Sequence, residues 1–67
     1  MTLGTELKKY RIVNCLTLDE LSKKSGISRV SLCLYESDKK KPRLSNIKKL
    51  ARILNFNETK FLEEHYL

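Results

Sequence analysis

Two helix-start signals with a glycine between them restrict the fold of this chain more than any other feature. Residues 17–20 (TLDE) have the spacing of a capping box, in which a hydroxyl and a carboxylate each bond a free backbone N–H. This predicts a helix over about residues 18–24, with Gly26 in the left-handed conformation that closes it. Ser28 can then cap a second short helix. Two short helices joined by such a turn form a helix-turn-helix, here at about residues 17–36.

The rest of the chain is also predicted to be helical. One proline and two glycines interrupt it, and apolar side chains recur every three or four residues in segments 3–10 and 47–54. Ser45 is a candidate cap for a fourth helix and Asn57 for a fifth. We therefore predict one all-α domain of five helices over residues 1–67. Its predicted core is Leu7, Tyr10, Leu16, Leu21, Ile27, Leu32, Tyr35, Ile47, Leu50, Leu54 and Phe61.

The basic charge of the chain points to a polyanionic partner. Fourteen Lys and Arg exceed eight Asp and Glu, which gives a net charge of +6. Residues 1–57 hold thirteen of these basic and five of these acidic side chains, whereas residues 58–67 hold one and three. A basic body on so small a domain predicts nucleic acid first and an anionic membrane surface second.

The composition argues against membrane insertion, catalysis and metal chemistry. No apolar run reaches the length of a bilayer span, so we expect a cytoplasmic chain with no membrane association. Cys15 and Cys33 lack the dense spacing of a disulfide scaffold and are expected to be thiols. His65 has no ligand set suited to zinc, and no nucleophile has a base beside it. We expect no enzyme activity, no metal and no cofactor.

Several of these segments together match a known family. Residues 4–62 resemble the XRE family, the lambda-repressor-like, five-helix DNA-binding domains found in Cro and the phage repressors. The resemblance implies a third helix in the DNA major groove, a dimer on two half-sites, and a structural ion pair between Arg11 and Glu36. The matching elements are Gly4, Leu7, Arg11, the segments LTLDELSKKSGIS and LSNIKKLARIL, Glu36 and Pro42.

The third helix has more apolar residues than one buried stripe needs. With Leu32 at the centre of the buried face and about 100° per residue, Val30 and Leu34 face outward and Arg29 and Cys33 flank them. Arg29 can grip guanine through two parallel hydrogen bonds. The other three offer contacts such as those to thymine methyl groups, at positions where glutamine and other polar residues are frequent in the family. The predicted base-reading residues are Arg29, Val30, Cys33 and Leu34, and the alternative is that this apolar face binds a protein.

A second predicted set contacts the DNA backbone. The basic loop after the third helix should meet phosphates beside the groove, and hydroxyl groups can add donors. Family members often have a glutamine at the position of Leu18, where it contacts the DNA backbone, and Thr17 or the start of the second helix is the candidate for that contact here. The set comprises Thr17, Ser28, Ser37, Lys39, Lys40, Lys41 and Arg43.

The C-terminal segment holds more apolar side chains than the interior of so short a domain requires. We expect Phe56, Leu62, Tyr66 and Leu67 to form a two-fold dimer contact, although capping of the core by the last helix would also explain them. The sequence thus predicts a sequence-specific transcriptional regulator, a repressor that binds double-stranded DNA as a homodimer. The alternatives are a protein-interaction module of the same fold and a nonspecific DNA binder. The expected place of action is the bacterial cytoplasm or nucleoid, and the sequence leaves open whether the source is a phage, a plasmid or another mobile element, or a chromosome.

Overall fold

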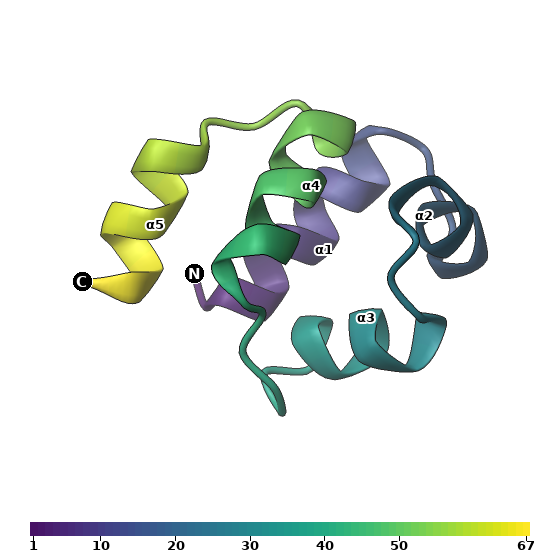
Figure 1. Cartoon of the computed structure of the whole chain (residues 1–67), viewed down its shortest axis with the longest axis horizontal. Coiled ribbons are helices and arrows are strands. Elements are labelled where there is room, and N and C mark those ends of the chain that lie inside the picture. Colours follow the sequence, from purple (N-terminus) through teal and green to yellow (C-terminus); the bar gives the residue numbers. More distant parts are fainter.

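The computed structural model describes residues 1–67 and contains five helices and no strand, so the predicted all-α fold is confirmed (Figure 1). None of the helices has the length and hydropathy that a bilayer span requires. The helices are α1 (Leu3–Val13), α2 (Leu18–Ser25), α3 (Arg29–Glu36), α4 (Leu44–Leu54) and α5 (Glu58–Tyr66).

The helix starts follow local capping chemistry at most positions. Thr17 and Glu20 form the predicted capping box at the start of α2, and Gly26 ends that helix with a φ of 73°. Ser28 caps α3 by accepting the backbone N–H of Ser31. Asn57 caps α5 in the same way, by accepting the backbone N–H of a residue in its first turn. The predictions for these three helix starts are confirmed.

The predicted cap for α4 is wrong. The helix begins at Leu44, Arg43 occupies the N-cap position without a side-chain hydrogen bond, and Ser45 lies inside the first turn. Pro42 is buried two residues before the start of α4. No side chain therefore caps the first backbone N–H groups of α4, of which that of Asn46 donates to the Arg43 carbonyl oxygen at 3.0 Å.

The core forms where the five helices meet. Tyr10 and Leu16, predicted to be core residues, are only partly buried and pack against it, whereas Leu3 joins it. Tyr10 stays near the surface because its hydroxyl donates to Glu6 at 3.0 Å. The buried cluster consists of Leu3, Leu7, Leu21, Ile27, Leu32, Tyr35, Ile47, Leu50, Leu54 and Phe61.

The arrangement places α3 at the edge of the molecule. In Figure 1, α1 and α4 lie in the middle, α2 and α3 at one end, and α5 at the other end beside α4. The whole domain measures 29 × 23 × 21 Å. Because α3 packs on both α1 and α2, one of its faces is buried and the other stays free.

The close approach of α1 to the end of α3 depends on a glycine. A Cβ at Gly4 would lie 2.5 Å from the backbone carbonyl oxygens of both Tyr35 and Glu36. Two polar contacts secure the same junction. Arg11 holds Glu36 with Nε–Oε2 at 2.7 Å and Nη2–Oε1 at 3.1 Å, and Asp38 accepts the Gly4 N–H at 2.8 Å.

Replacing Gly4 with alanine should lower the free energy of unfolding by about 1–3 kcal/mol, because neither carbonyl is free to move away from the new methyl group. On an open helix surface the same change stabilises by roughly 0.5–1 kcal/mol. Urea denaturation measures the difference, with Gly26→Ala as the control. That site is open but has a positive φ, so a cost of about 1–2 kcal/mol there reflects backbone strain alone. A Gly4→Ala protein as stable as the original would contradict the steric account.

Candidate nucleic-acid interface

The outer face of α3 is exposed and partly apolar. Leu32 and Tyr35 are buried in the core, which turns the opposite face of the helix to solvent. Val30 is 69% exposed, Cys33 is exposed as a free thiol, and Leu34 is half-buried. The structure therefore brings the four predicted base-reading residues to one side of the molecule, with Arg29 also exposed.

Arg29 has a partner that the sequence did not suggest. Its Nε lies 3.0 Å from Oδ1 of Asp19, in the first turn of α2, and the two side chains are 64% and 72% exposed. An ion pair this exposed contributes only about 0–1 kcal/mol to stability. The carboxylate lies at Nε, so both terminal nitrogens of Arg29 stay free for another partner. In the sequence, Asp19 is visible only as one residue of the capping segment.

The three hydroxyl residues predicted to touch a nucleic-acid backbone are exposed, but each already has a local bond. Thr17 accepts the Glu20 N–H, and Ser28 caps α3. The Ser37 hydroxyl donates to the carbonyl of Leu34 at 3.2 Å. Thr17 and Ser28 thus hold helix starts in place, and Ser37 binds the last turn of α3.

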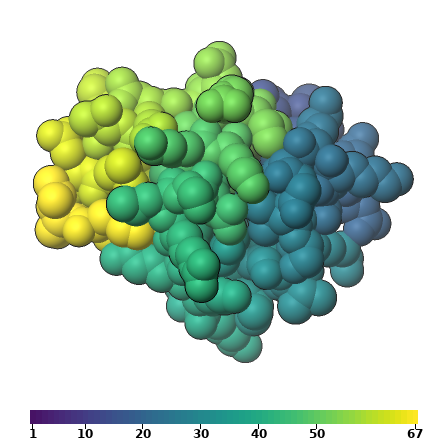
Figure 2. Space-filling model, in the orientation of Figure 1, coloured from purple at the N-terminus to yellow at the C-terminus, as the bar shows by residue number.

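A polar groove lies between the start of α3 and the start of α4. Lys40, Lys41, Arg43 and Lys49 line it with hydroxyl and amide side chains, and no carboxylate lines it. The uncapped start of α4, at Arg43, lies at the same groove. Figure 2 shows the green loop and α4 at the front of the molecule, between α5 and the α2–α3 pair. Cationic side chains and free helix N–H groups together make a site for anions.

The lysines near this groove are not equivalent. Lys39 is exposed outside the groove lining. Lys41 lines the groove, but its Nζ lies 4.3 Å from the ring centroid of Tyr66 in α5. Lys49 was not among the predicted contacts, although its place on the polar face of α4, one helical turn after Ser45, could have indicated it.

The two acids that accompany this basic segment both contact the α1 region, Glu36 half-buried and Asp38 exposed. Asp38 accepts from the Thr2 hydroxyl at 2.6 Å and from the Gly4 N–H, and these hydrogen bonds hold the pKa of its carboxyl below the usual value. Glu36 binds Arg11, with 11% and 13% of the two side chains exposed. This ion pair ties α1 to α3, as the family resemblance implied. Arg11 offsets the charge of Glu36, whereas Asp38 keeps its negative charge beside the loop cations because both of its donors are uncharged.

The predicted dimer residues divide into two groups. Leu62, Tyr66 and Leu67 line a shallow apolar pocket together with Leu44. Phe56 lies elsewhere, because its ring stacks on Tyr10 with 4.7 Å between centroids and contacts Phe61 at 4.9 Å. The structure thus assigns Phe56 to packing within one chain and does not bring it to the pocket.

Potential metal ligands occur away from this face. Glu6, Glu64 and His65 are the only group of three or more such side chains whose ligand atoms converge, within 4.8 Å of one another. The group is not visible in the sequence because Glu6 is 59 positions from His65.

Comparison with known proteins gives one family and two similar structures. The helix-turn-helix family model matches residues 7–61. The structure of the SinR protein/SinI protein complex contains a chain that is 25% identical in sequence to this chain, covers 94% of it and has a TM-score of 0.85. This chain spans 62% of that one. The master regulator for biofilm formation SinR in complex with DNA is 24% identical, with 91% of this chain and 98% of that one covered and a TM-score of 0.84. No curated protein matches the sequence significantly.

Proposed function

The chain belongs to the XRE type of the helix-turn-helix family, and from this membership we propose that it is a sequence-specific DNA-binding transcriptional regulator without enzyme activity. The observation that carries the proposal is the exposed face of α3 beside a cationic groove that no carboxylate lines. The likeness to SinR, which has been crystallised with DNA, supports it.

In this proposal α3 enters the major groove and reads bases. Arg29, in the first turn of α3, grips guanine O6 and N7 with its two terminal nitrogens. Asp19 lies at Nε and holds the guanidinium in the orientation that this contact needs. Val30, Cys33 and Leu34 supply apolar contacts, for which the thymine methyl group is the matching base feature.

The groove beside α3 binds the DNA backbone. Lys40, Arg43 and Lys49, together with the uncapped start of α4, present cations and backbone donors to phosphates. Lys39 adds charge at the rim, and Lys41 contributes from its position over Tyr66. The Thr17 hydroxyl accepts within the chain and has its proton free to donate to a phosphate. The Ser28 and Ser37 hydroxyls donate to a phosphate after rotating away from Ser31 Oγ and the Leu34 carbonyl. These contacts position α3 without selecting a sequence.

The regulator acts as a homodimer and represses transcription from an inverted-repeat operator in the cytoplasm. The apolar pocket formed by Leu44, Leu62, Tyr66 and Leu67 provides a matching patch on each copy. Two copies related by a two-fold axis would present their α3 helices to successive turns of the major groove.

A protein-binding module is the second candidate. It is favoured by the exposed apolar face of α3, where Val30 is 69% exposed at a position that is frequently polar in the family. The structure of SinR in a complex with the SinI protein also favours it. If Leu34→Glu abolishes a protein complex while the unaltered chain has no affinity for duplex DNA, this second function replaces the first.

Selection of bound duplexes from a random pool should enrich a symmetric motif. On that motif, Arg29→Ala should reduce discrimination at one guanine by about 1–3 kcal/mol. Lys40→Ala should weaken binding to all duplexes and lower the salt-dependence slope by about one. Both are measured by fluorescence anisotropy at several salt concentrations, with Lys60→Ala in α5 as the charge-matched control. No enrichment, or affinity that is insensitive to salt, would exclude the proposal.

Replacing Asp19 with asparagine should separate the effect of Asp19 on the orientation of Arg29 from the effect of its negative charge on DNA binding. Loss of the carboxylate frees the Arg29 side chain, so discrimination at the guanine should fall roughly three- to tenfold, by less than the Arg29→Ala effect. Affinity for unrelated duplexes should rise, because one negative charge has left the DNA-facing surface. In the Arg29→Ala background the same change should leave discrimination unaltered. Full discrimination in Asp19→Asn would show that the ion pair has no role in reading.

Leu62→Glu should disrupt the dimer, since it places a charge in an apolar contact. Sedimentation equilibrium should then give a monomer, and affinity for the inverted repeat should fall toward that for a single half-site. Lys60→Gln lowers the net charge by the same one unit on α5, at a position outside the apolar pocket, and serves as the control. An original chain that stays monomeric at high concentration, with and without operator, would rule out the dimer.

A further inference from the structure

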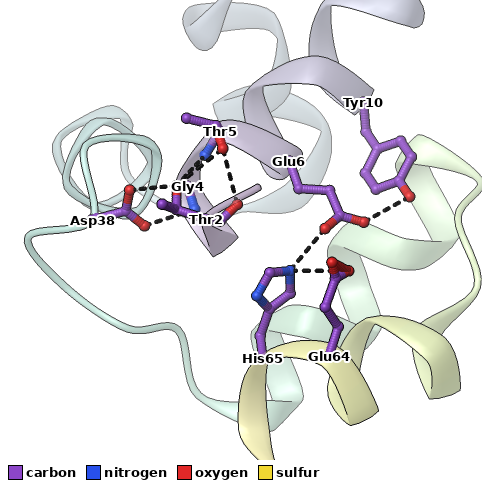
Figure 3. A network of polar contacts seen from close by, with 8 residues as sticks. All are labelled: Thr2, Gly4, Thr5, Glu6, Tyr10, Asp38, Glu64 and His65. Atoms are coloured by element: carbon purple, nitrogen blue, oxygen red, sulfur yellow. Dashed lines mark hydrogen bonds and ion pairs between the residues drawn. The ribbon is translucent and has the colours of Figure 1, made fainter.

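Three side chains with metal-ligand chemistry meet where α5 packs on α1 (Figure 3). Nε2 of His65 lies 2.8 Å from Oε1 of Glu6 and 3.5 Å from Oε1 of Glu64. The side chains of Glu6 and His65 are only 10% and 8% exposed. Two carboxylates, one from each helix, therefore converge on the same imidazole nitrogen.

The charge of this group is not balanced within the chain. No Lys or Arg pairs with Glu6 or Glu64, whose only ionic partner is His65. Nε2 carries at most one proton, so it can donate to both carboxylates only by sharing that proton between them. Even a protonated imidazole leaves two carboxylates with a net negative charge, and one of them is buried. A buried uncompensated charge is costly, so the group favours an added cation.

The ligand atoms are already oriented by neighbouring side chains. The Tyr10 hydroxyl donates to Oε2 of Glu6 at 3.0 Å, which turns Oε1 toward His65. The His65 ring lies against Phe61, with 4.6 Å between centroids. Contacts of this kind, made by residues behind the ligands, fix the ligands and strengthen metal binding.

We propose that Glu6, Glu64 and His65 bind a divalent transition-metal ion of the zinc type. The ligands are one carboxylate oxygen from each glutamate and Nε2 of His65, and water fills the fourth position. In a tetrahedral site with bonds of about 2.0–2.2 Å, ligand atoms lie roughly 3.3–3.5 Å apart. The separations here, from 2.8 Å to at most 4.8 Å, require only small side-chain movements.

The donor set also indicates which ions fit. Imidazole suits zinc and its neighbours in the first transition row, whereas magnesium and calcium require six or more oxygen ligands. A bound ion would cross-link α1 and α5, two helices at opposite ends of the chain. The proposal is independent of DNA binding, because no residue of the α3 face or of the cationic groove takes part.

The test is a titration of the metal-free chain with zinc chloride, in which NMR of the His65 ring nitrogens monitors binding. The chain has one histidine, so the signal reports this site alone, whereas bulk metal content would include zinc bound by the exposed Cys15 and Cys33. We expect a saturable shift of the Nε2 resonance at one equivalent of zinc. Magnesium chloride should leave the resonance unchanged. An unchanged ring in tenfold excess zinc would overturn the proposal.

A matched pair of variants tests the ligand set. Glu64→Gln keeps the side-chain shape at a half-exposed position and should weaken zinc binding at least about tenfold. Glu63→Gln removes an exposed carboxylate of the same helix outside the group, and it should bind zinc as the original chain does. Equal binding by the Glu64→Gln and original chains, or equal loss in both variants, would show that these three side chains do not form the site.

Discussion

The contact between the start of α1 and the end of α3 fixes the geometry on which the rest of the structure depends. At Gly4 no side-chain atom fits between the helix backbone and the carbonyls of Tyr35 and Glu36. Arg11 binds Glu36 and Asp38 returns to the first turn of α1, so polar contacts reinforce the steric one. Because α3 has only eight residues, holding its last turn in this way sets the direction of the whole helix.

The same contacts shape the electrostatics of the surface. Glu36 and Asp38 are the only acids between Glu20 and Glu58, and both are engaged by α1. Arg11 offsets the charge of Glu36, whereas Asp38 is held by uncharged donors and keeps its charge. The packing that places α3 also leaves a groove next to it that cationic side chains line and no carboxylate lines. The shape and the charge that the proposed DNA contact needs thus come from one arrangement of helices.

Most of the helix boundaries were predictable from the sequence, and the exceptions have physical causes. The capping box, Gly26 and Ser28 act on backbone groups within a few residues, so their effect does not depend on the fold. Ser45 does not act as a cap, because α4 already begins at Leu44 with Arg43 in the N-cap position. The contact of Lys41 with Tyr66 was not predictable, and neither was the contact of Phe56 with Tyr10. Both contacts join segments that meet only after the helices have packed.

The sequence by itself determined the fold class, the helix-turn-helix and the buried face of α3, because capping and apolar periodicity are properties of neighbouring residues. Only the tertiary structure decided that Asp19 lies beside Arg29 and that Glu6 meets His65 across 59 positions of the chain. Such pairs depend on the angles and offsets at which helices pack. Those angles are set by the fit of all core side chains together, and no single segment of the sequence encodes them.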